Sequence, residues 1–212
     1  MINVKKLVVG PLSSNAYVVY DSDANAGIIV DAGGDGTKIV ALVKRLDVKI
    51  SHLCGTHAHF DHILAAKQVK DVLSCEFLIH KDDVWLLERA PESIKKYVGD
   101  DVPEIAEPDG YLYEGYTLEV GQHIVKVLHT PGHTPGSVSI VSDGLVFTGD
   151  TLFAGTVGRT DFPGGNAEQL AESLSKKLMS LPDDYVVYPG HGRPTTIGAE
   201  MKSNPFIKIA KR

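Results

Sequence analysis

Short runs of hydrophobic residues, bounded by Gly, Pro, Asp and Asn, recur along the chain in the manner of β-strands. In the first half this pattern predicts strands at Ile2–Val9, Asn15–Tyr20, Ala26–Val30, Ile50–Cys54 and Glu76–Ile79. In the second half it predicts strands at Thr117–Val120, His123–Leu128, Ser137–Val141, Leu145–Phe147 and Tyr185–Tyr188.

Apolar residues spaced three or four positions apart predict helices between these strands. Residues 91–110 contain several prolines and acids and predict an exposed excursion. Each half runs from strands into a strand–helix–strand order, which predicts an α/β (α+β) fold of two mixed sheets packed face to face with helices outside. The expected helices run from an N-cap at Thr37 to Leu46, and over Ile63–Val72, Asp82–Ala90, Ala167–Leu181 and Gly198–Lys202.

Length and composition limit the number of domains and the classes of partner that the chain can have. At 212 residues and 43% hydrophobic, the chain can bury a core and is predicted to form one domain over residues 1–212. A net charge of −6 without a polybasic stretch argues against a nucleic-acid partner. Because no signal-peptide core or membrane-length apolar run occurs, we expect no membrane partner and a cytoplasmic location. Nothing in the composition predicts the oligomeric state.

The two cysteines carry no chemical signal of their own. Cys54 and Cys75 lie in apolar surroundings and lack C-x-x-C spacing. We therefore expect both to be buried, reduced thiols without a catalytic or disulfide role.

The strongest chemical signal is the segment Thr56-His57-Ala58-His59-Phe60-Asp61-His62. Imidazole nitrogens and carboxylate oxygens are the ligands that zinc and similar divalent ions prefer. The spacing suits a turn from a strand into a helix, in which His57 and His59 point the same way and Asp61 and His62 follow. Three imidazoles and a carboxylate this close together are costly unless a metal ion organises them. The segment therefore predicts a metal site.

Three further residues share a position at the end of a predicted strand. His133, Asp150 and His191 each follow an apolar strand and lie next to glycine. Strand ends place side chains rigidly, and glycine lets the backbone come close to a metal. The histidines without this context are expected to be structural or on the surface: His52, His80, His123 and His129.

The number of candidate ligands favours two metals over one. Five histidines and two aspartates exceed the three or four protein ligands that one catalytic zinc uses. Two ions that share a carboxylate would use all seven. We therefore expect two divalent ions, zinc first, with iron or manganese as alternatives.

This constellation resembles the metallo-β-lactamase superfamily over almost the whole chain. The resemblance implies a four-layer αβ/βα sandwich with Asp150 bridging two metals. Asp61 would bind metal or orient the attacking water, and both roles stay open. The implied ligand groups are His57, His59 and His133 for one metal, and Asp61, His62 and His191 for the other.

Within that superfamily, Gly155–Gly165 and Thr195–Phe206 are similar to the short, single-domain glyoxalase II type, the hydroxyacylglutathione hydrolases. That likeness implies a thioester hydrolase acting on a small molecule, in which a metal-bridging hydroxide attacks the carbonyl carbon. The larger glyoxalase II enzymes carry basic residues for glutathione in a C-terminal helical extension. This chain stops at Arg212 without such an extension, so the thiol is left open.

Two residues near the expected site have two interpretations each. Arg159 would bind a substrate carboxylate or pair internally with Asp161. Asp31 would hold a ligand histidine in one tautomer or cap its own loop. Three aromatic residues could line the pocket, although core packing is the expectation for Phe153, Phe162 and Tyr113.

Other functions remain as alternatives to the hydrolase. A persulfide dioxygenase of the same superfamily has a similar Gly-Arg-Thr-Asp-Phe stretch and uses one iron. A β-lactamase or phosphodiesterase is a weaker alternative, and a non-catalytic metal-binding or sensing domain is the third.

Overall fold

A computed structural model describes the backbone of residues 1–210 and the side chains of residues 1–207. The first half of the chain forms a mixed six-stranded sheet in which the strands follow one another in sequence order. The first three strands are antiparallel and the last four are joined in parallel. These strands are β1 (Ile2–Val9), β2 (Ser14–Asp21), β3 (Ala26–Val30), β4 (Lys49–Cys54), β5 (Glu76–His80) and β6 (Gly110–Leu112).

The second half forms another six-stranded sheet, of order β14-β13-β10-β9-β8-β7. Only β10 and β13 pair in parallel, and a short two-stranded ribbon of β11 and β12 stands apart. These strands are β7 (Thr117–Val120), β8 (His123–His129), β9 (Val138–Ser142), β10 (Leu145–Gly149), β11 (Leu152–Phe153), β12 (Thr156–Val157), β13 (Val186–Pro189) and β14 (Thr195–Thr196).

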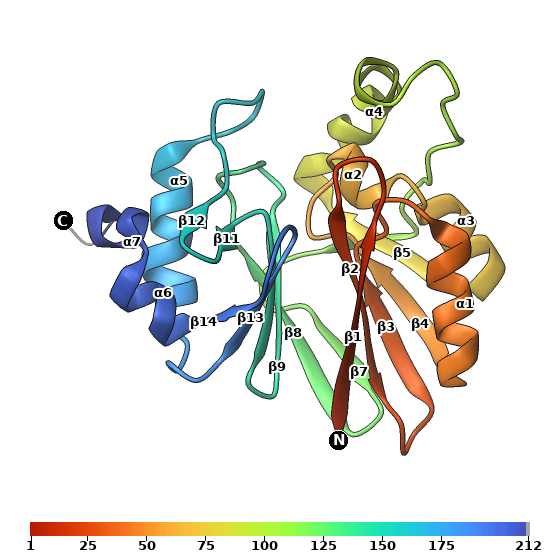
Figure 1. Cartoon of the computed structure of the whole chain (residues 1–212), viewed down its shortest axis with the longest axis horizontal. Coiled ribbons are helices and arrows are strands. Elements are labelled where there is room, and N and C mark those ends of the chain that lie inside the picture. The colour runs from red at the N-terminus through yellow and green to blue at the C-terminus, as the bar shows by residue number, and fades with distance from the viewer. Residues whose placement is uncertain (211–212) are drawn as a thin grey trace.

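Helices cover the outer face of each sheet (Figure 1). Those beside the first sheet are α1 (Gly36–Leu46), α2 (Phe60–Ile63), α3 (Ala66–Leu73) and α4 (Val84–Tyr97), with a 3-10 turn at Lys81–Asp83 before α4. Those beside the second are α5 (Ala167–Glu172), α6 (Ile197–Ser203) and α7 (Pro205–Ala210), with a π-helical turn at Ser173–Lys177 and a 3-10 turn at Leu178–Ser180 after α5.

Burial on both faces explains why the central strands β2, β3, β5, β9 and β10 are nearly continuous apolar runs in the sequence. In β2, Tyr17 and Val19 pack between the two sheets, whereas Ala16 and Val18 pack against the helices. Successive side chains of a strand point to opposite faces, so such a strand is apolar at every position. The predicted arrangement of two mixed sheets with helices outside is confirmed.

The predicted excursion over residues 91–110 is wrong at its start, because α4 continues through Pro91 to Tyr97. Proline lacks an N–H and crowds the preceding turn, which is why the sequence indicates a break there. Leu87, Ala90 and Ile94 are buried on one face of α4, and this packing keeps the helix continuous across Pro91.

Three other helix boundaries differ from the prediction. The N-cap of α1 is Asp35 rather than Thr37, because the Asp35 carboxylate accepts a hydrogen bond from Gly10 N at 3.0 Å and fixes the loop before the helix. The expected helix over Ile63–Val72 is divided, since Ala65 N donates to the Ala32 carbonyl at 2.8 Å. The helix expected over Ala167–Leu181 changes its hydrogen-bond pattern after Glu172, where Ser175 Oγ donates back to the Ala171 carbonyl at 2.8 Å.

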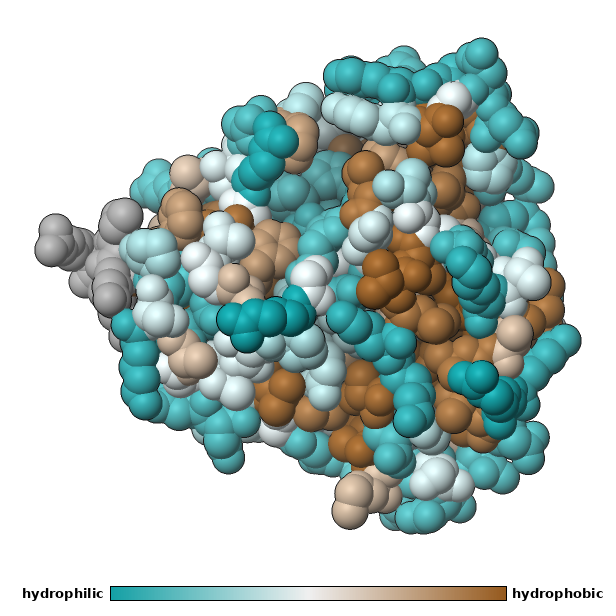
Figure 2. All heavy atoms as spheres, in the orientation of Figure 1, coloured by the Kyte–Doolittle hydropathy of each residue, from teal (hydrophilic) through white to brown (hydrophobic). Residues whose placement is uncertain are grey.

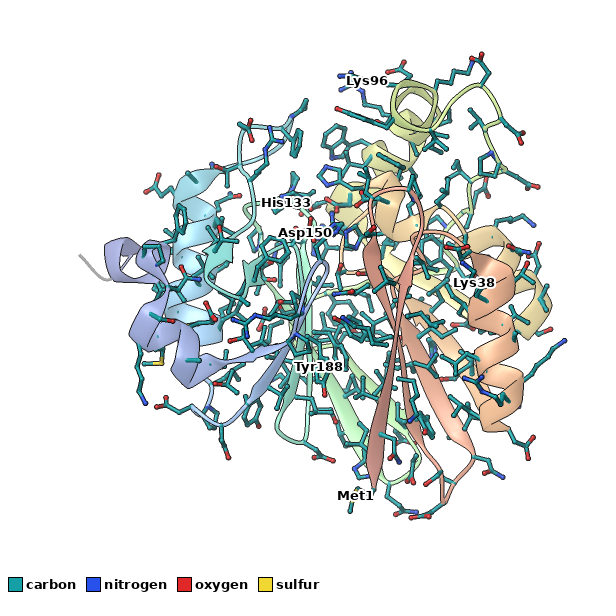
Figure 3. The ribbon with its side chains drawn as sticks, viewed as in Figure 1. Met1, Lys38, Lys96, His133, Asp150 and Tyr188 are labelled. Carbon is teal, nitrogen blue, oxygen red and sulfur yellow. The ribbon has the colours of Figure 1, made fainter. Side chains whose placement is uncertain are left out.

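The two sheets meet so that strand ends from both lie along one edge of the molecule. Figure 2 shows this edge hollowed between the two halves, and Figure 3 places His133 and Asp150 there. In the part of the chain that the structure describes, no helix has both the length and the apolar character needed to cross a membrane.

Candidate metal centre

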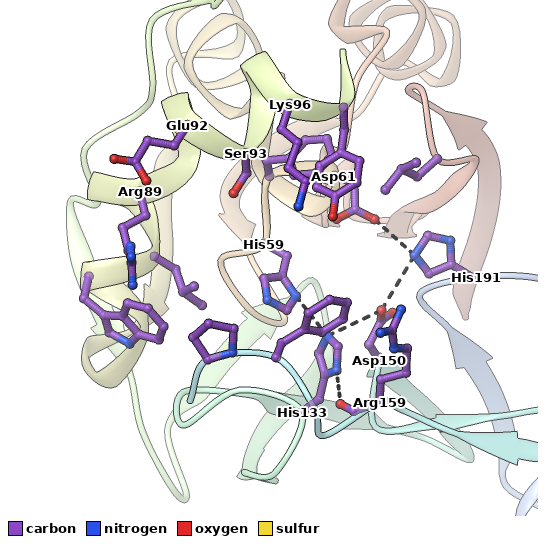
Figure 4. Close-up of a pocket in the computed structure, with 17 residues that line it drawn as sticks. His59, Asp61, Arg89, Glu92, Ser93, Lys96, His133, Asp150, Arg159 and His191 are labelled. Atoms are coloured by element: carbon purple, nitrogen blue, oxygen red, sulfur yellow. Dashed lines mark hydrogen bonds and ion pairs between the residues drawn. The ribbon is translucent and has the colours of Figure 1, made fainter. Parts of the chain in front are cut away.

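The seven candidate ligands come together at the edge where strands of both sheets end, and Figure 4 labels five of them: His59, Asp61, His133, Asp150 and His191. Four of them follow a strand of the first sheet, and three follow strands of the second. After β4 come His57, His59, Asp61 and His62, while His133 follows β8, Asp150 follows β10 and His191 follows β13.

The ligands form two groups of three, and in each group one atom from each residue lies within 4.8 Å of the others. In the first group, His59 Nδ1 and His133 Nε2 are 2.9 Å apart. In the second, His191 Nε2 lies 3.2 Å from Asp61 Oδ2. The groups are His57, His59 and His133, and Asp61, His62 and His191.

Asp150 lies between the two groups (Figure 4). Its Oδ1 is 3.4 Å from His62 Nε2, and its Oδ2 is 3.7 Å from both His133 Nε2 and His191 Nε2. One carboxylate thus contacts a histidine of the first group and two of the second. This is the position that a shared ligand would occupy.

Unpaired polar atoms show that the residues fit a metal. Among the described residues, four buried side-chain atoms have no hydrogen-bond partner: His57 Nε2, His62 Nε2, Asp150 Oδ1 and Asn15 Oδ1. A buried polar atom without a partner costs free energy, and native structures hold few of them. Three of the four belong to the ligand cluster, where bound divalent ions would supply the missing partners.

Burial and mutual proximity keep two histidines of the first group neutral. Burial, reinforced by His62, lowers the pKa of His57 well below its usual value. Burial, with His133 beside it, lowers the pKa of His59 to about 4. Both imidazoles therefore carry free lone pairs at neutral pH, which is the state that binds a metal.

In the second group, neighbouring carboxylates and histidines favour each other's charged forms. Burial alone would raise the pKa of Asp61, but His62 and His191 lower it overall. Burial alone would lower the pKa of His62, but Asp150 and Asp61 raise it well above the usual value. The carboxylates stay ionised and available as oxygen ligands.

Asp31 combines both of its predicted interactions. It is buried and has a positive φ of 61° at the end of β3. Its carboxylate accepts hydrogen bonds from Thr56 N at 2.7 Å and Thr56 Oγ1 at 2.9 Å, which caps the loop after β4. It also lies 2.8 Å from His62 Nδ1, and this contact turns His62 Nε2 towards the ligand cluster.

Asp83 is a site residue that the sequence did not reveal. Its fully buried carboxylate accepts hydrogen bonds from Ala58 N at 3.0 Å, Thr134 Oγ1 at 2.8 Å and Gly136 N at 2.6 Å. Ala58 lies between two candidate ligands, and Thr134 follows His133. Asp83 therefore ties together the loops after β4 and β8. In the sequence it reads only as one of two acids at a helix start.

The loop after β13 is fixed just as closely. Asn15 Nδ2 donates to the Pro189 carbonyl at 2.8 Å and to the Gly192 carbonyl at 3.0 Å. A Cβ atom at Gly190 would lie 2.2 Å from Asp150 Oδ1. Only glycine leaves room there for Asp150.

Five of the seven candidate ligands line a cleft of about 470 Å³, namely His59, Asp61, His133, Asp150 and His191. Arg159 lines it, and its guanidinium pairs with Asp161 at 2.9 and 2.7 Å and lies 4.3 Å from the ring centre of Phe162. The predicted ion pair between Arg159 and Asp161 is therefore formed, and the Arg159 side chain also lines the cleft. Other lining residues come from α4, and they include Trp85, Arg89, Glu92, Lys96 and Tyr97.

The core-packing expectation for the three aromatic residues is wrong. Phe162 and Phe153 line the cleft or its continuation, and Tyr113 is 57% exposed. Of the four histidines expected to be structural or on the surface, His52 and His123 belong to no possible ligand group among the described residues. His80 and His129 lie outside the seven candidate ligands but form a separate group with Asp82. Both cysteines are free and buried, as predicted.

A pair of face-to-face mixed sheets with a His/Asp cluster at the strand ends defines a class of metal-binding hydrolases. The chain belongs to the metallo-beta-lactamase superfamily, whose sequence model matches residues 9–191 and so includes all seven candidate ligands.

Relatives of similar length support this assignment. Hydroxyacylglutathione hydrolase GloC of Haemophilus influenzae is 35% identical over 209 residues, which cover 97% of this chain and 98% of the relative. The crystal structure of BLEG-1, titled a B3 metallo-beta-lactamase, has a TM-score of 0.89 at 37% identity and covers 97% of this chain and 99% of its own. The structure of TTHA1623 in a di-iron-bound form has a TM-score of 0.85 at 36% identity, with 95% and 99% covered. The predicted family and fold are confirmed.

Proposed function

We propose that this protein is a metal-dependent thioester hydrolase that cleaves S-(2-hydroxyacyl)glutathione or a related acyl thiol. The observation that carries the proposal is the pair of complete ligand groups with Asp150 in contact with both, because such a site has ligands for two divalent ions. Similarity to the hydrolase GloC supports the substrate class, and similarity to the di-iron form of TTHA1623 supports a two-metal site.

The chain's own residues hold and orient this centre. The two ligand groups and Asp150 would hold two divalent ions, whose chemistry would be to lower the pKa of bound water and to polarise a carbonyl oxygen. His62 Nδ1 donates a hydrogen bond to the Asp31 carboxylate, and His133 Nδ1 donates one to the Arg159 carbonyl. Each ring is therefore protonated at Nδ1, and its Nε2 faces the cluster. Ser14 Oγ donates to Asp61 Oδ2 at 3.2 Å and restricts that carboxylate.

Neither cysteine is suited to act as a nucleophile. Cys54 packs between the sheets, and burial raises the pKa of Cys75 to about 11. A thiolate is also a good leaving group, so thioester cleavage needs little proton donation from the protein. Free, buried thiols further support our inference of a cytoplasmic location.

The test combines metal content and turnover on one preparation. We expect two ions per chain and cleavage of S-lactoylglutathione without oxygen uptake. Asp150→Asn should lower kcat/KM by about 100-fold or more, since metal-site partners typically matter by about 10–100-fold and Asp150 contacts both groups directly. His52→Gln, outside the cluster, is the matched control and should leave kcat/KM unchanged. One iron per chain with oxygen consumption on glutathione persulfide would favour the persulfide dioxygenase instead.

A β-lactamase is the second candidate, because the structure of BLEG-1 carries that title at 37% identity. Nitrocefin is therefore a parallel substrate in the same assay. Nitrocefin turnover without thioester cleavage would overturn the thioesterase proposal. Full metal loading without activity on any of these substrates would favour a metal-binding or sensing domain.

A further inference from the structure

One wall of the cleft is formed by α4 and carries an alternating pattern of charge. Arg89, Glu92 and Lys96 all line the cleft and are exposed to solvent. Their spacing of three and four residues puts them on one face of the helix. A helix rises about 1.5 Å per residue, so Arg89 and Lys96 are about 10 Å apart along its axis, with the carboxylate of Glu92 between them.

Both cations are held against aromatic rings. The Arg89 guanidinium lies 5.9 Å from the ring centre of Trp85, and Lys96 Nζ lies 5.1 Å from that of Tyr97. Tyr97 in turn stacks on Phe60, with ring centres 5.8 Å apart and planes 8° from parallel. Cation–π contacts of this kind position a charge without using its hydrogen-bond donors.

Both cations lie more than 4 Å from the carboxylates of the described residues. Within the described residues, Arg89 and Lys96 form no ion pair, whereas Arg159 on the opposite wall is paired with Asp161. In Figure 4, Lys96 points from α4 towards the ligand cluster and Arg89 lies at the far end of the cleft. The chain as a whole has a net charge of −6, so Arg89 and Lys96 form a local positive region on an acidic protein.

We propose that this face of α4 recognises the thiol half of the substrate, with Arg89 and Lys96 binding two carboxylates and Glu92 binding an ammonium group between them. The ligand class is a zwitterionic peptide thiol that carries two carboxylates and an ammonium group. The cleft volume of about 470 Å³ suits a small peptide lying along α4 with its acyl group at the metal centre. This inference rests on the proposed thioester chemistry.

The single tryptophan of the chain provides a binding assay that needs no turnover. Trp85 lines the cleft beside Arg89, so its fluorescence should change when the wall is occupied. The probe is S-methylglutathione, a thioether without a scissile thioester bond. We expect saturable binding to the wild type and about tenfold weaker binding to Lys96→Ala and Arg89→Ala, as for loss of one charge-assisted hydrogen bond. Glu92→Gln should also bind more weakly.

Lys95→Ala is the matched control, because Lys95 is the neighbouring exposed lysine in the last turn of α4 and does not line the cleft. It should bind the probe like the wild type. In turnover, Lys96→Ala should raise KM for S-lactoylglutathione with kcat retained, and it should leave the neutral thioester S-lactoyl-N-acetylcysteamine unaffected.

The outcomes separate the two proposals. Equal affinity of the Lys95 and Lys96 variants, or no saturable binding to the wild type, overturns recognition by α4. Cleavage of the neutral thioester without binding of the probe overturns α4 recognition alone. Probe binding that depends on Lys96, without cleavage of any thioester, supports α4 recognition and overturns the thioesterase.

Discussion

Replacing Asp83 by asparagine should loosen the connection between two loops that carry metal ligands. The Asp83 carboxylate accepts hydrogen bonds from Ala58 N in one loop and from Thr134 Oγ1 and Gly136 N in the other. Asparagine has nearly the same shape but only one acceptor oxygen, so its NH₂ group must face at least one of these donors.

The size of the effect follows from these contacts. A hydrogen bond to a charged group contributes about 1.5–3 kcal/mol, and a buried donor left without a partner costs about 1–3 kcal/mol. Burial raises the pKa of Asp83, which shows that desolvation of the carboxylate offsets part of this gain. We therefore expect Asp83→Asn to lower the free energy of unfolding by about 2–4 kcal/mol. Zinc affinity should fall by about 10–100-fold, as for other groups that orient metal ligands.

Urea unfolding of the metal-free protein and zinc titration against a competing chelator measure the two effects. Asp82→Asn is the matched control, since the Asp82 side chain is 46% exposed and lies next to Asp83 in sequence. If the two variants unfold at the same urea concentration and bind zinc equally, Asp83 does not couple the loops.

Three further predictions concern the metal, the glycine beside it and the response to pH. Metal at 100 times its Kd should add about 2.7 kcal/mol to the free energy of unfolding. A chelator should therefore lower the midpoint of thermal unfolding, and added zinc should restore it. A midpoint that the chelator leaves unchanged argues against a metal site. Gly190→Ala should weaken zinc binding at least tenfold in a titration, because the added Cβ would lie 2.2 Å from Asp150 Oδ1. If the variant binds zinc with the affinity of the wild type, the loop moves freely. Burial and the stacked His129 lower the pKa of His80, so the unfolded state binds more protons and stability should fall as the pH drops below about 6.5. His80→Gln should flatten that part of the stability curve in urea titrations at pH 5–7, and an unchanged slope would assign it to other groups.

The ligand cluster was predictable because each ligand follows the end of a strand. A strand buried on both faces is recognisable as an apolar run, and the polar residue after it lies at the strand's end whatever the packing of the sheets. The parallel strands β10 and β13 end at the same edge of the second sheet, which brings Asp150 near His191. The two-residue strands, by contrast, are too short to carry a periodic pattern, and they were not predicted.

Asp83 was missed for a different physical reason. Its hydrogen-bond donors Ala58 and Gly136 lie 25 and 53 residues away in the sequence. Nothing local distinguishes it from Asp82, and both have the composition of a helix start. A buried carboxylate that joins two loops becomes visible only when tertiary packing brings those loops together.

The misprediction at Pro91 bears directly on substrate recognition, and it can be tested. An interior proline costs a helix about 3 kcal/mol, of which about 1 kcal/mol is recovered because proline restricts the unfolded chain. Full burial of a Leu or Ile side chain contributes about 1.5–3 kcal/mol, so Leu87 and Ile94 together outweigh that cost and carry α4 on to Lys96. Pro91→Ala should therefore raise the free energy of unfolding by about 2 kcal/mol in urea and leave the affinity for S-methylglutathione unchanged. If the variant instead binds the probe differently, the proline sets the position of Lys96, and packing alone does not determine the recognition face.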